Sequence, residues 1–395
     1  MNRALLHSEA QNFIRNYSED TAALAFKGSP FEGITVQELI EQIESFRKTK
    51  KKLPSWHHTE GIYFPSKLNI EQTSSELTAE YKASLVSGAT LADITAGLGV
   101  DSFYFAKNFD TVAYFELNTK LTAIAKHNFE RLGAANINCS NADGLAISMQ
   151  GRYNIIYVDP ARRHSAKGKV FFLKDCEPNV VGKTRDILNH CDTLLIKTSP
   201  MLDISVGMSE LKHVVEIHVV AVENEVKELL WLLRKDATTS IAIKTVNIAK
   251  TKEERFDFIY GVEALPSYGL PLQYLYEPNA AIMKAGAFTQ ISEAYGLLKL
   301  QSNSHLYTSA ELLEFPGRQF KIDQMIPYRK NEIKKHLVGL KANIATRNFP
   351  ETVQILRKKW KIIDGGEVYL FFTTLLNNDK IVLICSKINS SFGKD

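Results

Sequence analysis

The sequence has few cysteines and lacks any long apolar run. Its four cysteines, Cys139, Cys176, Cys191 and Cys385, are scattered without the paired spacing of a zinc knuckle or a disulfide framework. We therefore expect all four to be reduced and structural, with no metal site. No apolar stretch is long enough to span a membrane, and the first residues mix polar side chains into every turn, unlike a signal peptide. These absences predict a cytoplasmic protein without membrane association.

The chain also lacks a strong excess of either charge. It has 48 Lys and Arg against 44 Asp and Glu, which gives a formal net charge of +4. Any argument for nucleic-acid binding must therefore depend on where the basic residues lie. With 395 residues, 45% of them hydrophobic, the chain can form two or three domains, each with its own core. There is no long repeat or low-complexity segment.

The most informative stretch is LADITAGLGVD, from Leu91 to Asp101, a short apolar run that ends at Asp93 and is followed by two glycines. Gly97 and Gly99 predict a turn from a strand into a helix at which the backbone approaches a ligand, because side chains there would keep the ligand away. Alone, such a pair is equally compatible with a plain tight turn.

Three further acids follow strand-like runs downstream. Glu116 ends the run that begins at Val112, about twenty residues after the first glycine, where nucleotide-binding sheets place the acid that holds the ribose hydroxyls. The segments Asn141-Ala-Asp143-Gly144 and Tyr153-Asn-Ile-Ile-Tyr-Val-Asp159-Pro160 each put an acid just after a strand. Together with Asp93, four acids are predicted at four consecutive strand ends.

The charge of the first helical turn after the glycines indicates which kind of ligand binds there. A carboxylate at Asp101, in the first helical turn, would repel a diphosphate but suits a ligand with an ammonium and a sulfonium. Here the sequence resembles the class I S-adenosylmethionine-dependent methyltransferases, through DITAGLGVD, YFE, NADG and VDPARR. The resemblance implies S-adenosyl-L-methionine as cofactor, the catalytic residues Asp159, Pro160 and Arg162, and a set of cofactor-binding residues. That set is Asp93, Ala96, Gly97, Gly99, Asp101, Glu116, Leu117, Asp143 and Gly144.

The fold class predicted is α/β, a seven-stranded Rossmann-like domain with an N-terminal helical cap and C-terminal α+β modules. The expected domains are the cap (1–75), the cofactor-binding domain (76–262), a small ferredoxin-like α+β module (263–317) and a THUMP-like α+β domain (318–395). Strands are expected at 91–94, 111–116, 136–140, 153–159, 193–198, 213–222 and 240–248.

Three local expectations accompany this fold. A capping box of Thr73 and Glu76 should begin a helix, and 224–234 should form the last helix before the final strand. Segments 367–375 and 380–388 should pair as a hairpin around Leu376-Asn-Asn-Asp379.

The C-terminal part, with RNFPETVQILRKKW and DGGEVYLFFTTL, is similar to bacterial methyltransferases that end in a THUMP-like domain, and this resemblance implies an RNA partner, tRNA or rRNA. Basic residues there are interleaved with aromatic ones, a pattern that suits an RNA backbone and unstacked bases, although it also suits ordinary solvated helices. The basic residues are Lys321, Arg329, Lys330, Lys334, Lys335, Lys341, Arg347, Arg357, Lys358, Lys359 and Lys361. The aromatic residues are Phe320, Tyr328, Phe349 and Trp360.

The residues after Asp159-Pro160 are Ala161, Arg162 and Arg163, without the second proline and aromatic residue of related amino-methylating enzymes. The two arginines suit a phosphate, or they form structural ion pairs. No cysteine occupies the positions at which related carbon-5 methyltransferases have their nucleophile, so the resemblance implies that a nitrogen or oxygen attacks the methyl group directly. The alternatives are a methyltransferase of a small molecule or protein, or a non-catalytic RNA-binding protein with the same fold. The oligomeric state and the RNA target stay open.

Overall fold

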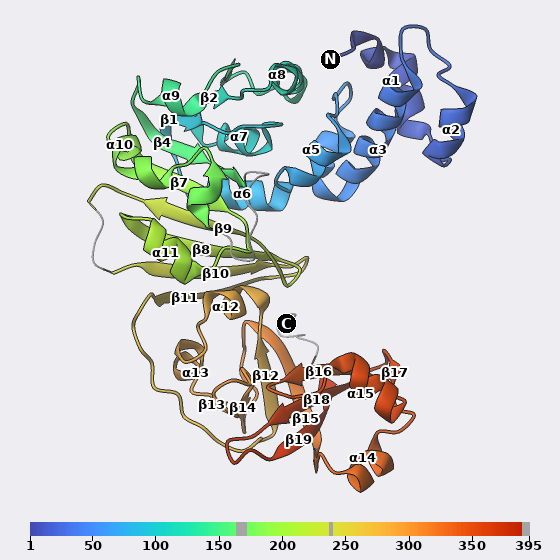
Figure 1. The fold of residues 1–395 in the computed structure, drawn as a ribbon, viewed down its shortest axis with the longest axis vertical. Helices are drawn as coiled ribbons and strands as arrows, with labels where there is room; N and C mark the ends of the chain where they lie inside the picture. Colours follow the sequence, from blue (N-terminus) through green and yellow to red (C-terminus); the bar gives the residue numbers. More distant parts are fainter. Residues whose placement is uncertain (163–171, 237–239, 389–395) are drawn as a thin grey trace, which may run out of the picture. The chain divides into compact units, whose positions relative to one another are not determined.

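The computed structural model describes residues 1–162, 172–236 and 240–388, so Arg163 lies outside the described residues (Figure 1). Its contacts divide the chain into two compact units. The first contains Met1–Val222 and Lys227–Ile241, and the second contains Glu223–Val226 and Ala242–Asp395.

The first unit begins with short helices around one longer helix, α3. A capping box of Thr35 and Glu38 starts α3, whose buried face carries Leu39, Ile43 and Phe46. The next helix then begins at Pro54, a residue that suits a first helical position. The elements are η1 (Arg3–Leu6), α1 (Ser8–Asn16), α2 (Thr21–Lys27), α3 (Val36–Lys52), α4 (Pro54–His58), α5 (Lys67–Gln72) and α6 (Glu76–Ser84).

The predicted capping box at Thr73 and Glu76 is wrong. Ser75 is the N-cap of α6 and accepts from the Thr78 amide, whereas Thr73 ends α5. This places Glu76 at the first helical position, from which its carboxylate accepts a bond of 2.7 Å from the Ser55 amide. The first turn of α6 is thereby connected to α4.

The first unit contains seven strands of one sheet, in the order β8-β9-β7-β4-β1-β2-β3. Numbered along the chain, this order is 6-7-5-4-1-2-3. Neighbours pair in parallel from β7 to β3, whereas β9 runs antiparallel to β7. The strands are β1 (Gly88–Asp93), β2 (Phe109–Phe115), β3 (Ile137–Ser140), β4 (Tyr153–Val158), β7 (Cys191–Thr198), β8 (Val214–Val222) and β9 (Glu225–Leu233).

Helices connect the parallel strands (Figure 1). The predicted helix after Glu116 is confirmed as α8, which buries Ile124, Ala125 and Phe129 and ends at Gly133 in the left-handed conformation. The helices are α7 (Val100–Phe105), α8 (Thr119–Leu132), α9 (Gly144–Ser148), α10 (Thr184–Leu188) and α11 (Ile204–Glu210). Two 3-10 turns, η2 (Leu173–Asp175) and η3 (Val181–Lys183), and a small ladder of β5 (Ala161–Arg162) with β6 (Cys176–Glu177) complete the unit.

The predicted helix at 224–234 is wrong, because this segment is strand β9. Glu223 and Asn224 both have positive φ, 49° and 63°, as a two-residue hairpin turn of type I′ requires. The run Leu229–Leu233 is buried, as expected for a central strand covered on both faces. The seventh strand of the first unit is therefore β9. The expected strand at 240–248 exists as β10 and belongs to the second unit.

The second unit contains a β10–β11 hairpin and an eight-stranded sheet of order β13-β14-β12-β15-β19-β18-β16-β17. The predicted hairpin at the end of the chain is confirmed as β18 and β19. The strands are β10 (Ala242–Ile248), β11 (Glu253–Ile259), β12 (Tyr274–Pro278), β13 (Leu298–Lys299), β14 (Tyr307–Ser309), β15 (Gly317–Pro327), β16 (Lys341–Arg347), β17 (Ile363–Asp364), β18 (Val368–Thr374) and β19 (Lys380–Lys387). The helices are α12 (Ala280–Ala285), α13 (Gln290–Ala294), α14 (Lys330–His336) and α15 (Val353–Trp360).

The aromatic residues of the C-terminal segment pack inside this unit. Phe320 is fully buried and Trp360 is 7% exposed. Tyr328 and Phe349 are half-buried, and they pack on each other and on Phe372. The expectation that basic residues and aromatic rings together form an RNA surface is wrong for Phe320 and Trp360, because both rings belong to the core.

Candidate functional site

The order of the parallel strands reverses at β1, whose neighbours are β4 and β2, and loops leave this point in opposite directions. Ligands of such sheets bind in the crevice at the carboxyl ends of the strands beside such a reversal. Asp93 is the last residue of β1, Glu116 follows β2, and Asp159 follows β4. Thr95 connects two of these acids, since its amide donates to Asp93 (3.2 Å) and its hydroxyl accepts from the Asp159 amide (2.7 Å).

The two glycines of the turn after β1 have different roles. Both have positive φ, +56° at Gly97 and +84° at Gly99. A Cβ at Gly99 would lie 2.4 Å from the ring of Phe129, whereas a Cβ at Gly97 would meet nothing within 4 Å. Gly99 is thus required by internal packing, and Gly97 faces open space. Gly144 also has a packing role, because a Cβ there would lie 2.7 Å from the backbone of Ile94.

Glu116 organises the glycine turn. Its carboxylate accepts from the amides of Gly97 (3.0 Å) and Asn118 (2.7 Å), one bond to each oxygen. The amide of Ala96 donates to the carbonyl of Phe115 (3.0 Å), which connects the same turn to the end of β2. Leu117, the next residue, is 73% exposed and presents an apolar surface beside this carboxylate.

Asp143 is exposed and caps α9, where one carboxylate oxygen accepts from the amides of Leu145 (3.0 Å) and Ala146 (3.3 Å). A cap of this kind stabilises a helix by itself. The second oxygen is not used by the cap.

Behind the glycine turn lies a buried cluster of charged side chains. Lys82 of α6 and Glu228 of β9 are 0% and 2% exposed and are joined by bonds of 2.7 and 2.8 Å. Asp101 lies 3.3 Å from the Lys82 ammonium and accepts from the hydroxyls of Ser74 (2.9 Å) and Tyr157 (2.8 Å). The cation beside Asp101 in this structure is therefore Lys82.

Asp93 is buried beside this cluster. The pKa of its carboxyl is raised to about 8, chiefly by burial and also by the nearby Asp101, although the hydrogen bond from the Ser102 hydroxyl (2.6 Å) opposes the rise.

Lys197, the penultimate residue of β7, lies beside Asp159 and donates to its carboxylate at 2.5 Å. Burial would lower the pKa of Lys197, but the carboxylates of Asp159, Glu228 and Asp101 outweigh it and raise the pKa, so the side chain is an ammonium at neutral pH. Sequence reasoning missed this residue. Its signal was a single lysine in the otherwise apolar strand end Leu194-Leu-Ile-Lys-Thr198.

Pro160 is buried, and Arg162 is exposed in β5, opposite Cys176 of β6. Burial raises the pKa of the Cys176 thiol to about 11, so little thiolate exists at neutral pH. This cysteine is therefore a poor nucleophile, although it lies near the fourth strand end.

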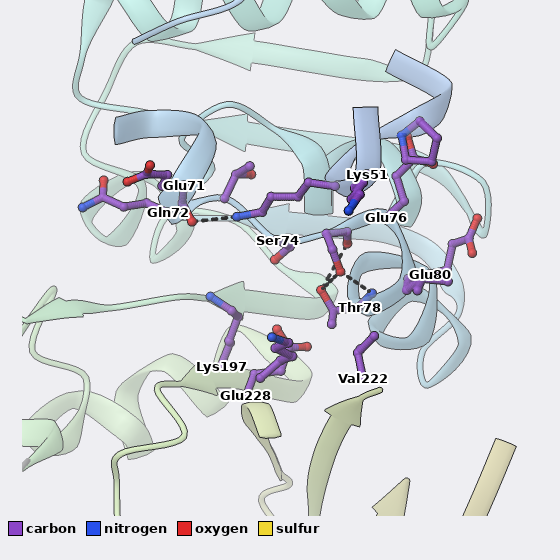
Figure 2. Close-up of a pocket in the computed structure, with 16 residues that line it drawn as sticks. Lys51, Glu71, Gln72, Ser74, Glu76, Thr78, Glu80, Lys197, Val222 and Glu228 are labelled. Atoms are coloured by element: carbon purple, nitrogen blue, oxygen red, sulfur yellow. Dashed lines mark hydrogen bonds between the residues drawn. The ribbon is translucent and has the colours of Figure 1, made fainter. Parts of the chain in front are cut away.

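A cavity of about 640 Å³ lies next to Lys197 (Figure 2). Its walls come from the end of α3, from α5 and α6, and from the strand residues Lys197, Val222, Lys227 and Glu228. Ser74, which bonds Asp101, also lines it. The cavity therefore adjoins both the charged cluster and the Asp159–Lys197 pair. Among the described residues, no group of His, Cys, Asp and Glu side chains could hold a metal ion, and no helix is long and apolar enough to cross a membrane.

The strand order, the glycine turn and the acids at the following strand ends define a class I methyltransferase fold in the first unit. The chain belongs to the same family as a protein of Porphyromonas gingivalis W83 whose crystal structure is described as that of a "putative methyltransferase". The two are 31% identical, with a TM-score of 0.86 over 96% of this chain and 97% of that one.

In the second unit, residues 274–316 match a ferredoxin-like domain family and residues 317–387 match a THUMP domain-like family. An rRNA methylase from Streptococcus thermophilus, 15% identical, covers 40% of this chain and 94% of its own length with a TM-score of 0.30. A comparison with curated proteins gives no match.

Proposed function

We propose that this protein transfers a methyl group from S-adenosylmethionine to a nitrogen or oxygen of RNA by direct in-line displacement. The observation that carries the proposal is the gathering of Gly97, Glu116 and Asp159 around the strand reversal at β1. It is supported by membership of a family that includes a protein described as a methyltransferase.

The residues at the glycine turn fit the cofactor. Gly97 leaves open space where a Cβ would stand, so the backbone can lie against a ligand. Each oxygen of Glu116 accepts one amide and keeps a lone pair for a ribose hydroxyl, and the exposed Leu117 offers an apolar contact for adenine. We assign Asp93, Ala96, Gly99, Asp101, Asp143 and Gly144 to shaping this site. When bound, the cofactor supplies an electrophilic methyl group on a sulfonium.

On the acceptor side, Asp159 and Pro160 follow β4, and Asp159 receives the proton that the acceptor loses. Much of the rate can come from holding the acceptor in line with the methyl group. A thiol nucleophile is not required, since the pKa of Cys176 is raised well above neutral. Arg162, exposed beside this strand end, suits a phosphate of the substrate.

The RNA part of the proposal rests on the THUMP-like segment and on exposed lysines. Lys330 and Lys334 lie one turn apart on α14, and both are exposed. Because the aromatic rings nearby are packed inward, we expect this surface to bind the phosphate backbone and to read no bases.

Labelled methyl transfer tests the activity. The full-length protein is incubated with methyl-labelled S-adenosylmethionine and total RNA from cells that lack it, and we expect label in RNA. Labelled protein or small molecules with unlabelled RNA would contradict the RNA assignment. Failure of S-adenosylhomocysteine to bind in calorimetry would contradict the cofactor assignment.

A matched pair of variants tests the RNA surface. Lys330→Gln/Lys334→Gln removes two charges from α14, and Lys27→Gln/Lys126→Gln removes two exposed charges from α2 and α8. Affinity for RNA falls as salt rises. If both α14 lysines contact phosphate, the plot of log affinity against log salt concentration should be less steep by about 2 in the first variant. Equal slopes in both variants would exclude α14 as the RNA surface.

A further inference from the structure

The carboxylate of Asp159 is held by one of its two oxygens. Oδ2 accepts a hydrogen bond of 2.5 Å from the Lys197 ammonium. The side chain of Asp159 is 34% exposed and that of Lys197 is 15% exposed, so the carboxylate lies between a largely buried cation and solvent. Among the described residues, none donates to the other oxygen, Oδ1. One oxygen is therefore fixed by the protein, and the other can accept from a substrate.

The partner of Asp159 lies on the neighbouring strand. Val158 of β4 is in register with Ile196 of β7, so Asp159 and Lys197 are the next residues along two adjacent parallel strands. The backbone of Asp159 is also held, because its amide donates to the Thr95 hydroxyl at 2.7 Å. Groups carried by paired strands are placed more precisely than groups on loops. The bond from Lys197 therefore fixes the side chain where the sheet has already fixed the main chain.

Lys197 is itself held between carboxylates. Asp159, Glu228 and Asp101 raise its pKa against the effect of burial, so it stays an ammonium. Behind it, the two oxygens of Glu228 bond the buried ammonium of Lys82 at 2.7 and 2.8 Å. Figure 2 shows Lys197 and Glu228 on the same wall of the cavity. Charges of opposite sign therefore surround Lys197 and keep its ammonium beside Asp159.

Without this cation, nothing among the described residues would select one orientation of the Asp159 side chain. A partly exposed carboxylate that lacks a partner turns toward water and occupies several rotamers. Asp159 also lies near the buried Asp93 carboxyl, whose pKa it helps to raise, so the two acids repel each other whenever both are ionised. A charge-assisted bond such as that from Lys197 opposes both effects.

We infer that Lys197 is a positioning residue, which holds the Asp159 carboxylate with Oδ1 toward the methyl acceptor and does not itself bind the acceptor. This inference rests on the proposed function, in which Asp159 receives the proton that the acceptor loses. Transfer in line depends on how the acceptor is aligned, so a carboxylate that turns away lowers the rate of transfer and leaves cofactor binding intact.

The orientation of Asp159 tests this inference without reference to activity. We expect crystal structures of the wild type and of Lys197→Met to share one fold, with the Asp159 carboxylate rotated or spread over several rotamers in the variant. Lys51→Met is the control, because the exposed Lys51 lines the same cavity and does not bond Asp159. An Asp159 side chain that keeps its wild-type orientation in Lys197→Met would overturn the inference, whatever the substrate is.

Kinetics separates positioning from direct binding of the substrate. Lys197→Met should lower kcat about 100-fold and leave both the KM for RNA and the affinity for S-adenosylhomocysteine within about threefold of the wild type. Lys51→Met should keep the wild-type kcat. A raised KM with an unchanged kcat would show that Lys197 binds the substrate, and it would overturn the inference.

A double-mutant cycle shows whether Lys197 acts through Asp159. If it does, adding Lys197→Met to Asp159→Asn should slow transfer by no more than about threefold, whereas a further loss of about 100-fold would overturn the inference. The double variant leaves no unpaired charge in this pair, so it serves even if Lys197→Met alone does not fold. Absence of methyl transfer by the wild type would contradict the proposed function, and the orientation of Asp159 in the crystal structures would still decide the role of Lys197.

Discussion

Substitution of Glu116 by glutamine gives a direct test of the glycine turn. The carboxylate accepts the Gly97 amide on one oxygen and the Asn118 amide on the other. Glutamine has a single acceptor oxygen, so in either orientation its NH₂ group faces one of the two backbone amides, donor against donor. One backbone bond is lost, and the ribose loses one of the two acceptors that we assign to it.

The size of the effect follows from the charge of the acceptor. A hydrogen bond to a charged group contributes about 1.5–3 kcal/mol, and loss of one such bond to the cofactor should weaken binding by about 10- to 150-fold. Calorimetry with S-adenosylhomocysteine measures this change. Asp110→Asn, an exposed change near the start of β2, is the control and should bind normally. An affinity for Glu116→Gln within twofold of the wild type would refute the ribose assignment, and so would tight binding of NAD.

Three further predictions concern stability. The folded-state pKa of Asp93 is raised to about 8. Its contribution to the free energy of unfolding is therefore fully present below about pH 4 and is lost as the pH rises to 8. The melting temperature of Asp93→Asn minus that of the wild type should therefore be more positive at pH 8 than at pH 5. An equal difference at both pH values would contradict this. Burial lowers the pKa of His305 to about 4, so stability present above pH 6.5 is lost as the pH falls through 4. Asparagine tolerates the positive φ of 51° at this position. The free energy of unfolding in urea should therefore decrease less between pH 7 and pH 4.5 in His305→Asn than in the wild type. Trp360→Ala should cost about 3–5 kcal/mol in chemical unfolding because it empties a core site. Weaker RNA binding with unchanged stability would instead make Trp360 a base-stacking residue.

The strand ends could be predicted because their signals are local. Asp93, Glu116 and Asp159 each follow an apolar run, and each lies at or directly after the strand that the run predicted. The segment 224–234 was harder because a run such as Leu229–Leu233 is equally apolar in a helix and in a central strand. The deciding signal was the two-residue turn Glu223-Asn224, which is less recognisable than Asn-Gly.

The side-chain partners at the site depend on contacts between distant segments. The bond from Lys82 to Glu228 joins residues 146 positions apart, and the bond from Lys197 to Asp159 joins residues 38 apart. No local pattern shows such pairs. The burial of the aromatic residues in the C-terminal segment could not be predicted either. Their spacing in the sequence does not distinguish a core residue such as Trp360 from an exposed one.

The pairing of β12 with β15 has a consequence for how the second unit is inherited. The boundary between the ferredoxin-like and THUMP-like matches falls between residues 316 and 317, yet Leu275 on one side is paired with Phe320 on the other in the same ladder. Exchange of either segment alone between genes would leave a strand edge without its partner, and exposed edges promote aggregation. We therefore expect proteins that contain one of these two segments to contain the other as well.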